Sequence, residues 1–342
     1  MKIIVKVFVT GAKGYVGNVL IDVLKEKNHS IIGCDTEFYP QEFLDKKSTI
    51  IECIKKDIRD LESKDLEGCE AVIHLAGLSN DPLGEINPNL TNEINYKATI
   101  HLAELAKENK IKHFVFSSSC SIYGANSDVV DENSQMAPLT AYAKSKVDSE
   151  KKLLELKDEI FSPIILRNAT VYGISPSQRL DIVVNNLVAS VVSTGKIKLL
   201  SDGSAWRPLL HVEDMARAFE FMITSDIEKV AGQIFNVGSN NDNYKVREIA
   251  EMIGNIIPKS KITFAEDASK DNRSYKVNFD KIEKLGFRTK WTLEDGIKHI
   301  YETMINNNFS ENDFNADSYF RVKYLKRLLD KKILDSNLRY MN

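Results

Sequence analysis

The stretch that decides the fold is Val9-Thr10-Gly11-Ala12-Lys13-Gly14-Tyr15-Val16-Gly17. It follows an apolar run at 3–10 and opens a helical pattern at 15–27. Glycines there permit a tight turn and bring a pyrophosphate close to the backbone and to the free amides of the helix N-terminus. A purely structural turn would use the same glycines, but the position after a first strand favours a dinucleotide site, with these candidate ligands: Gly11, Gly14, Tyr15, Val16 and Gly17.

A carboxylate follows at the expected place. Asp35 ends the apolar run 30–35, about 20 residues beyond the glycines, where an acid accepts both hydroxyls of the adenosine ribose. It would repel a 2′-phosphate, and no arginine stands beside it, so NAD is favoured over NADP. The alternative is a solvated turn aspartate. Asp57, after a third run, is a candidate acceptor for the adenine amino group.

Apolar runs continue along the first half of the chain, at 49–54, 71–77, 113–119 and 161–167, with helical patterns at 91–109 and 141–156. They show little polar alternation, which is typical of strands buried on both faces of a parallel sheet. The fold class predicted is α/β, a Rossmann-type doubly wound parallel sheet with a smaller discontinuous substrate domain.

The second half is less regular, with a helix expected near 180–194, a strand at 196–200, a returning strand at 233–237, and helices near 245–257 and 293–307. We expect a NAD-binding domain over 1–172, with about 208–240 rejoining it. A substrate domain is expected over 173–207 and 241–305. The last residues, 306–342, form an amphipathic helical tail packed on the body or on a second subunit.

Tyr142 and Lys146 lie one helical turn apart and share a face. An ammonium beside the phenol, with a cationic nicotinamide nearby, would lower the pKa of the tyrosine and suit it for general acid or base work. Most Tyr-x-x-x-Lys pairs are surface pairs. Here Ser119 stands just upstream at the end of a strand, where a hydroxyl would hold the reacting oxygen.

These motifs together resemble the extended short-chain dehydrogenase/reductases, in particular the NAD-dependent epimerase/dehydratase group that acts on nucleotide sugars. The resemblance covers roughly residues 3–300. It rests on the glycine turn, His74-Leu-Ala-Gly77, Ser117-Ser-Ser119, Tyr142 with Lys146, and two later stretches, Leu166-Arg-Asn-Ala-Thr-Val-Tyr-Gly173 and Trp206-Arg-Pro-Leu-Leu-His-Val-Glu-Asp214.

The resemblance assigns roles residue by residue. It makes Ser119, Tyr142 and Lys146 the catalytic triad, and adds these residues to the cofactor site: Ile58, Leu75, Ala76, Gly77, Asn95, Ser117, Asn168 and Val171. It places the substrate diphosphate on Arg207 and Arg273, since arginine suits bidentate phosphate contacts. Ser121 joins Ser119 beside the substrate.

The chain departs from the family pattern after the sixth strand. Where many epimerases carry an aromatic-aromatic-Asn run, this chain has Asn168-Ala169-Thr170, so Thr170 stands in place of the asparagine that usually touches the nucleotide sugar. Arg179 is a candidate extra phosphate ligand or, equally, a solvated arginine at a helix start. Ser79 faces the sugar or is only a turn former.

The function predicted is an NAD-dependent nucleotide-sugar C4 epimerase that oxidises its substrate transiently to a 4-keto sugar. The rivals are a 4-keto-sugar reductase and a nucleotide-sugar C4 dehydrogenase, and an inactive NAD-binding protein is a further alternative. Dehydratases of the resembling family carry an Asp-Glu pair directly after the catalytic hydroxyl residue. Here those positions are Cys120 and Ser121, so elimination is not expected.

The composition of the chain argues against several other classes of protein. The chain has 342 residues with 46 basic and 49 acidic ones, and a net charge of −3 argues against a nucleic-acid partner. No apolar run approaches the length of a membrane span, and the N-terminus is interpreted as a strand, not a signal peptide. Scattered Cys and His predict no metal site and a cytoplasmic location. The resemblance implies a homodimer through helices near 91–109 and 141–156.

Overall fold

The computed structural model describes residues 3–41, 43, 49, 51–79, 81–258, 260–269, 271 and 273–341. Its largest element is a parallel sheet of seven strands in the order β11-β7-β5-β4-β1-β2-β3, which confirms the predicted doubly wound α/β class. The strands are β1 (Lys6–Thr10), β2 (Ser30–Asp35), β3 (Glu52–Lys55), β4 (Ala71–His74), β5 (His113–Ser119), β7 (Ile164–Asn168) and β11 (Ile234–Val237).

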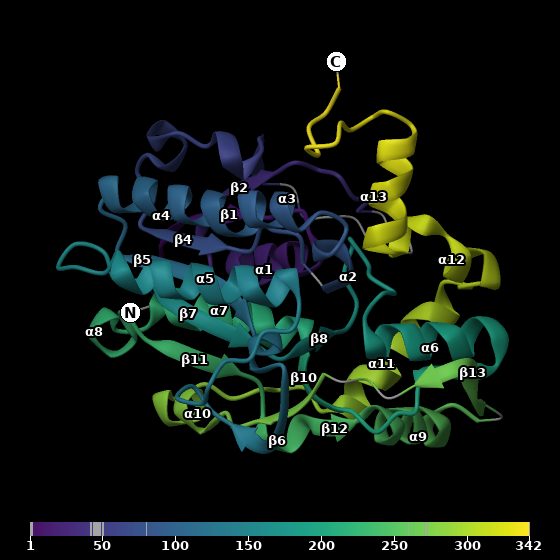
Figure 1. The fold of residues 1–342 in the computed structure, drawn as a ribbon. Helices are drawn as coiled ribbons and strands as arrows, with labels where there is room; N and C mark the ends of the chain where they lie inside the picture. Colours follow the sequence, from purple (N-terminus) through teal and green to yellow (C-terminus); the bar gives the residue numbers. More distant parts are fainter. Residues whose placement is uncertain are drawn as a thin grey trace.

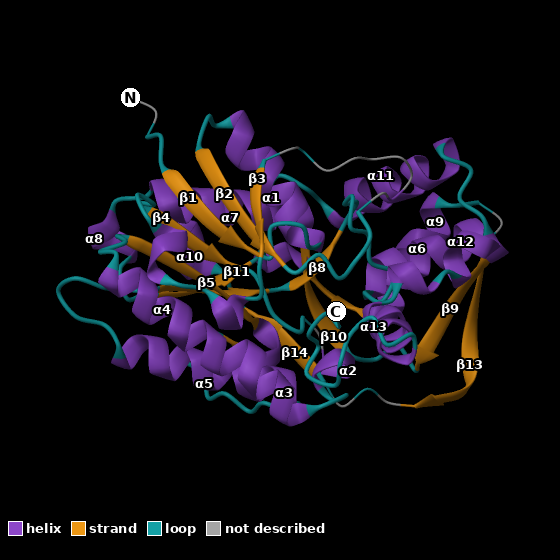
Figure 2. Cartoon of the chain, turned by 90° about the horizontal axis from the view of Figure 1, so that it is seen from above, coloured by secondary structure: helices purple, strands orange, loops and turns teal. Residues whose placement is uncertain are grey.

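Helices cover both faces of this sheet (Figures 1 and 2). Val7 and Val9 of β1 share a core with α1 (Tyr15–Glu26) and α7 (Val212–Thr224). Phe8, between them, shares a different core with α4 (Ala98–Glu108) and with Leu153 of α5 (Ala141–Glu155). Because successive strand residues point to opposite faces, both sets must be apolar, which explains the unbroken apolar runs of the sequence.

The second part of the chain packs beside the carboxyl ends of the sheet, on the right in Figure 1. Its core lies among α6 (Val183–Thr194), α9 (Val246–Ile256) and α11 (Leu293–Asn306). Short sheets complete it, formed by β8 (Thr170–Tyr172), β10 (Trp206–His211) and β12 (Asn243–Lys245), and by β9 (Lys196–Ser201) with β13 (Lys261–Ser269).

The other elements are α2 (Asp81–Gly84), α3 (Pro88–Asn92), α8 (Ile227–Val230), α10 (Asp280–Leu285), and β6 (Ala125–Val130), which pairs with β14 (Ser274–Val277). No helix among the described residues is long and apolar enough to cross a membrane.

The predicted helix over 91–109 is interrupted. After α3, the residues Glu93–Lys97 form a wider π-helical turn before α4 begins. The backbone carbonyl of Asn95 accepts hydroxyl hydrogen bonds from Thr99 (2.7 Å) and Ser149 (3.0 Å). Hydroxyls that insert into the backbone ladder in this way widen a helix locally.

Residues 208–240, which we expected to rejoin the NAD-binding domain, contact both the large sheet and the second part of the chain. β11 pairs with β7 as expected, and α7 covers the sheet. β10 instead pairs in parallel with β8, because the chain has already left the large sheet at Ala169 when β8 begins. The expected strand at 49–54 is observed as β3, and Ile50 lies outside the described residues.

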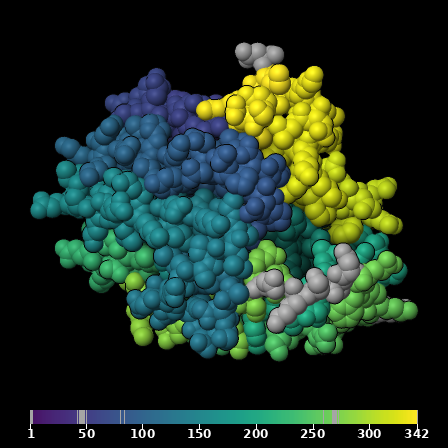
Figure 3. Space-filling view, viewed as in Figure 1, coloured from purple at the N-terminus to yellow at the C-terminus, as the bar shows by residue number. Residues whose placement is uncertain are grey.

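The C-terminal segment, residues 309–341, packs on the body and touches both parts. It contains α12 (Glu311–Asn315) and α13 (Arg321–Asp330). Phe309 joins the core of the second part, whereas Leu325 and Leu328 join the core below α4. Figure 3 shows this segment, in yellow, lying against the purple and blue residues of the N-terminal part.

Candidate active site

A cleft of about 900 Å³ opens at the carboxyl ends of the large sheet and extends to α6, β10 and the C-terminal segment. Ligands of doubly wound sheets bind at this edge. The lining includes every site residue predicted from the sequence except Asn95, namely Gly11, Gly14, Tyr15, Val16, Gly17, Asp35, Asp57, Ile58, Leu75, Ala76, Gly77, Ser79, Ser117, Ser119, Ser121, Tyr142, Lys146, Asn168, Thr170, Val171, Arg179, Arg207 and Arg273.

The glycine turn between β1 and α1 is as tight as its sequence predicts. Gly11 has φ +71°, and a Cβ there would lie 2.9 Å from the backbone nitrogen of Ala76. A Cβ on Gly17 would lie 2.0 Å from the carbonyl oxygen of Gly11. Gly14 starts α1 without a capping side chain, so the first amides of the helix stay available to a phosphate.

Asp35 supports this turn directly. Its two carboxylate oxygens accept the backbone amides of Lys13 (3.0 Å) and Glu37 (2.8 Å). Burial raises the pKa of Asp35, and the two amide hydrogen bonds oppose that rise. Each carboxylate oxygen keeps a second lone pair, which leaves the acid able to accept ribose hydroxyls.

Asp57, predicted to accept the adenine amino group, lines the cleft and is already paired with two arginines. Arg59 donates to both of its oxygens, at 3.0 and 2.7 Å, and Arg339 of the C-terminal segment lies 3.3 Å away. An adenine amino group would therefore share this carboxylate with two guanidinium groups.

Two buried polar side chains, His74 and Asn95, hold the end of β4 and the loop that follows it. His74 contacts Thr10 Oγ1 at 2.7 Å and Thr99 Oγ1 at 2.8 Å, and burial lowers its pKa to about 3, so the ring is neutral. Asn95, predicted to bind the cofactor, does not line the cleft. It accepts the amide of Leu78 (2.7 Å) and donates to the carbonyl of the same residue (3.0 Å), so it positions the loop.

The three predicted catalytic side chains come together at the end of β5. Tyr142 and Ser119 share a side-chain hydrogen bond. Ser119 Oγ also accepts the amide of Ser121 at 3.1 Å. Lys146 Nζ donates to the carbonyl of Ser117 at 2.7 Å and lies 5.8 Å from the centre of the Tyr142 ring.

The expected lowering of the tyrosine pKa is not produced by the chain alone. Burial raises the pKa of Tyr142 to about 12, although the hydrogen bond from Ser119 opposes the rise. Burial also lowers the pKa of Lys146 to about 8. The prediction assumed an ammonium against the phenol, whereas Lys146 points to the Ser117 carbonyl.

A buried ion pair that sequence reasoning missed supports the end of β5. Arg167 Nη2 lies 2.8 Å from Glu150 Oε2, and both side chains are almost fully buried. The same carboxylate contacts Ser118, next to the predicted catalytic serine. Arg167 and Glu150 lie on β7 and α5, so the pair became visible only once the fold joined these elements.

Three residues of the cleft carry a buried polar atom with no hydrogen-bond partner among the described residues: Asn168 (Oδ1), Ser121 (Oγ) and Arg321 (Nη1). Asn168 uses its amide nitrogen to hold β5, through Ser117 Oγ (3.2 Å) and the Ser118 carbonyl (3.0 Å). Unpaired buried polar atoms are costly, and their position in the cleft fits a polar ligand.

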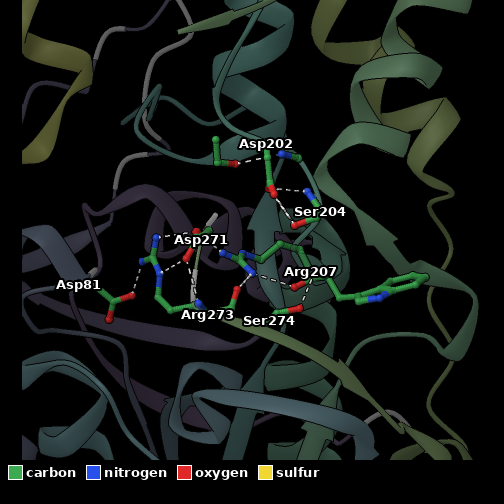
Figure 4. Close-up of polar contacts among 10 residues, drawn as sticks. Asp81, Asp202, Ser204, Arg207, Asp271, Arg273 and Ser274 are labelled. Atoms are coloured by element: carbon green, nitrogen blue, oxygen red, sulfur yellow. Dashed lines mark hydrogen bonds and ion pairs between the residues drawn. The ribbon is translucent and has the colours of Figure 1, made fainter. Parts of the chain in front are cut away.

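The two arginines predicted to bind a diphosphate converge on one acid (Figure 4). Arg207 Nη2 lies 2.6 Å and Arg273 Nη2 3.0 Å from the same oxygen of Asp271. Arg273 also reaches Asp81 at 2.8 Å. Burial alone would raise the pKa of Asp271, but the hydrogen bond from Arg273 and the charge of Arg207 lower it.

A second cationic group lies elsewhere in the cleft. Arg179 pairs with Asp181 (2.8 Å) and donates to Ser79 Oγ (3.2 Å), which brings together two residues whose roles the sequence left open. Arg321, from the start of α13, also lines the cleft. Sequence reasoning missed Arg321 because it lies in a tail interpreted only as an amphipathic helix.

The glycine turn beside free helix amides and the acid at the end of β2 are typical of a dinucleotide site in a Rossmann sheet. The Ser-Tyr-Lys set at the end of β5 adds acid-base groups to the same cleft, so the fold and site indicate the class of dinucleotide-dependent Rossmann enzymes. The comparisons agree with this class. Residues 7–238 match the NAD dependent epimerase/dehydratase family. The chain therefore belongs to that family, and NAD is its cofactor.

Named relatives include both epimerases and dehydratases. The chain is 28% identical over 311 residues to an uncharacterised UDP-glucose epimerase, YtcB, of Bacillus subtilis, covering 85% of this chain and 95% of that one. It is 26% identical over 348 residues to a dTDP-glucose 4,6-dehydratase of Escherichia coli, covering 90% and 95%. A solved NDP-hexosamine 5,6-dehydratase, TunA, shares the fold with a TM-score of 0.78 at 21% identity, covering 88% and 97%.

Proposed function

We propose that this chain is an NAD-dependent nucleotide-sugar C4 epimerase in which Ser119, Tyr142 and Lys146 are the catalytic residues. The contact that carries the proposal is the Tyr142–Ser119 hydrogen bond at the end of β5, with Lys146 one turn further along α5. Both hydroxyls line the cleft into which the predicted phosphate-binding arginines also project.

The residues at the sheet edge fit NAD. The α1 amides suit its diphosphate, Asp35 its adenosine ribose, and the unpaired Asn168 Oδ1 a donor of its nicotinamide end. When bound, NAD supplies a hydride acceptor and donor together with the positive charge of its nicotinamide ring. Further cofactor candidates that line the cleft are Ile58, Leu75 to Gly77, Ser117 and Val171.

Tyr142 would take the proton of the C4 hydroxyl and later return it to the C4 oxygen. Ser119, hydrogen-bonded to the phenol, would hold that oxygen between the two hydroxyl groups. Because the chain alone raises the pKa of Tyr142 to about 12, proton removal at neutral pH requires positive charge near the phenol. Burial lowers the pKa of Lys146 to about 8, so this side chain can release and take up a proton near neutral pH.

The substrate half follows from the charged side chains. We assign the diphosphate of the nucleotide sugar to Arg207 and Arg273, whose guanidinium groups now share Asp271. Thr170, Ser79 and Ser121, the remaining substrate candidates, line the same cleft as these arginines and the catalytic hydroxyls. Residues 1–172, together with about 208–240, would bind NAD, and residues 173–207 together with 241–305 would bind the substrate.

Elimination of water, the reaction of the dehydratase relatives, is not supported by the two residues that follow Ser119, which are Cys120 and Ser121. It requires a base for the C5 proton and an acid for the leaving C6 hydroxyl. Cys120 does not line the cleft. Its thiol contacts the carbonyl of Arg167 at 3.2 Å, and burial raises its pKa well above the usual range. Ser121 is a hydroxyl with no basic partner among the described residues.

We also propose a homodimer through α4 and α5. The apolar side chains of α4 are already buried in the monomer, and the outer faces of the two helices carry charges of both signs, from Glu104, Glu108, Lys144, Asp148 and Lys151. Such an interface would rest on ion pairs, so the mass measured by light scattering should fall from dimer to monomer at high salt.

Cofactor stoichiometry tests the proposal against its rivals. An epimerase recycles its NAD, so hexose turnover should continue for many cycles with one NAD per site and no build-up of NADH. The panel would contain UDP-, GDP-, dTDP- and CDP-hexoses, with products identified by NMR. Stoichiometric formation of NADH would identify a C4 dehydrogenase, and steady consumption of NADH with a 4-keto sugar would identify a reductase.

A further inference from the structure

The C-terminal segment brings a buried cation into the cleft. Arg321, the first residue of α13, is only 3% exposed and lines the cleft. Its Nη2 donates to the carbonyl (2.8 Å) and the hydroxyl (2.9 Å) of Ser177, and its guanidinium carbon lies 4.1 Å from the centre of the Tyr39 ring. Its Nη1 is buried and has no acceptor among the described residues.

Two buried cations lie close together here. Arg321 and Arg179 are both almost fully buried, and the negative charges that act on Arg321 are those of Asp181 and Asp35. Asp181 pairs with Arg179 at 2.8 Å and accepts the backbone amide of Arg321 at 3.4 Å. Burial, then the charge of Arg179, lowers the pKa of Arg321 to about 10. An anion bound at Nη1 would give this buried donor an acceptor and would also offset the repulsion between the two cations.

The location of Arg321 indicates which anion. The segment that carries it is fastened to the residues that follow β2 and β3: Tyr340 donates to the Glu37 carbonyl (3.1 Å), and Arg339 contacts Asp60 (3.0 Å) and Asp57 (3.3 Å). Tyr39, beneath the guanidinium, lies on the same connection as Asp35. The arginines assigned to the substrate instead contact Asp271 and Asp81.

We propose that Arg321 binds the diphosphate of NAD together with the amides of the glycine turn, so that the C-terminal segment forms part of the cofactor site. A guanidinium offers two parallel donors that match phosphate oxygens, and Nη1 is the donor still available. The residue lies outside 7–238, the stretch that matches the family.

Binding measurements on the cofactor-free protein test this without any need for turnover. Three variants would be compared with the parent chain by titration calorimetry: Arg321→Met, Arg321→Lys and, as a matched control, Arg327→Met. Arg327 is an exposed arginine of the same helix. The three probes are NAD, adenosine and UDP, which separate the diphosphate of the cofactor from its nucleoside and from the substrate site.

We expect Arg321→Met to weaken NAD binding by about 10- to 100-fold, as for a lost hydrogen bond to a charged group. Adenosine and UDP affinities should stay within about threefold, and Arg327→Met should match the parent chain. The melting temperature of cofactor-free Arg321→Met should not fall, because a buried cation with an unpaired donor is replaced by an apolar side chain.

Other outcomes would overturn the proposal. Unchanged NAD affinity in Arg321→Met would exclude the contact. A loss confined to UDP would place the substrate diphosphate there, and an equal loss for adenosine and NAD would show a structural role for the stacked guanidinium. If Arg321→Met does not fold, Arg321→Lys decides: it keeps the charge but loses the second donor, so NAD affinity should fall about tenfold while adenosine affinity is kept.

Discussion

Asp35 and Asp271 both face the cleft, but they are held in opposite ways. Asp35 accepts two backbone amides and thereby holds the glycine turn in place. Asp271 accepts two guanidinium groups that we assign to the substrate diphosphate. The cofactor half is thus supported by its acid, whereas in the substrate half the acid occupies the donors that a ligand needs. Removing a carboxylate should therefore weaken binding in one half and strengthen it in the other.

The largest effect is expected where the two halves meet. Tyr142→Phe removes the hydroxyl that moves the C4 proton, and turnover should fall by at least about 100-fold. NAD affinity should be kept, because the glycine turn, Asp35 and Lys146 are unchanged. Initial rates and NAD calorimetry measure the two effects separately. A variant that keeps most of its turnover would remove Tyr142 from the mechanism.

The burial of Lys146 lowers the free energy of unfolding by an amount that depends on pH. A Lys146 pKa lowered from 10.5 to about 8 corresponds to a destabilisation of about 3 kcal/mol. The unfolded chain binds the proton more tightly, so the cost is complete below pH 8 and disappears as pH rises to about 10.5. Lys146→Met removes this cost, but it also loses the hydrogen bond to the Ser117 carbonyl, which offsets about 1 kcal/mol of the gain in stability.

Urea unfolding of the cofactor-free chain at pH 7 and pH 10 checks this prediction. Lys146→Met should be more stable than the parent chain at the lower pH by about 2 kcal/mol, and the advantage should shrink at the higher pH. Lys151→Met, at an exposed position of the same helix, is the control. An advantage of equal size at both pH values would show that Lys146 is not held at a lowered pKa.

In the cofactor half, Asp35→Asn should weaken NAD binding by about tenfold. The amide replaces one acceptor with a donor, so either Lys13 or Glu37 loses its backbone partner and the ribose loses a charged acceptor. Calorimetry with NAD and UDP measures the change, and UDP affinity should be unaffected. Asp148→Asn, on the exposed face of α5, is the control; unchanged NAD affinity would mean that the ribose is held elsewhere.

In the substrate half, Asp271→Asn should strengthen UDP binding by about threefold, since Arg207 and Arg273 no longer share a negative charge. The gain should shrink at high salt, where exposed charges are screened. Asp202→Asn is a matched control, because its carboxylate caps Ser204 outside the cleft lining. A weaker affinity in Asp271→Asn would make Asp271 a support of the arginines and remove the contrast with Asp35.

The cofactor half was predictable because its features are local in sequence. The glycine turn, the start of α1 at Tyr15 and the end of β2 at Asp35 agree with the spacing that predicted them. Even there, the sequence assigned Asp35 only to the ribose, because the amides of Lys13 and Glu37 become its partners only after the turn has folded.

In the substrate half, the arginines could be predicted from the sequence, but their hydrogen bonds and ion pairs could not. Arg207 and Arg273 were expected at the substrate, yet Asp271 between them was not singled out, since one acid among many carries no sequence signal. Arg321 was missed because a buried donor is indistinguishable in sequence from a solvated arginine of an amphipathic helix. The contact of Asn95 with the backbone of Leu78 was not predicted, because a backbone partner is not encoded by residue type.

Deuterium incorporation distinguishes C4 epimerisation from elimination: the protein and NAD are incubated with each nucleotide hexose in deuterated water, and the product is analysed by NMR. We expect a C4 epimer with no deuterium at C5, because the cleft offers hydroxyls for C4 chemistry while Cys120 is turned away from it. A 6-deoxy-4-keto sugar carrying deuterium at C5, formed at an enzymatic rate, would rule out the proposed epimerase and identify a dehydratase.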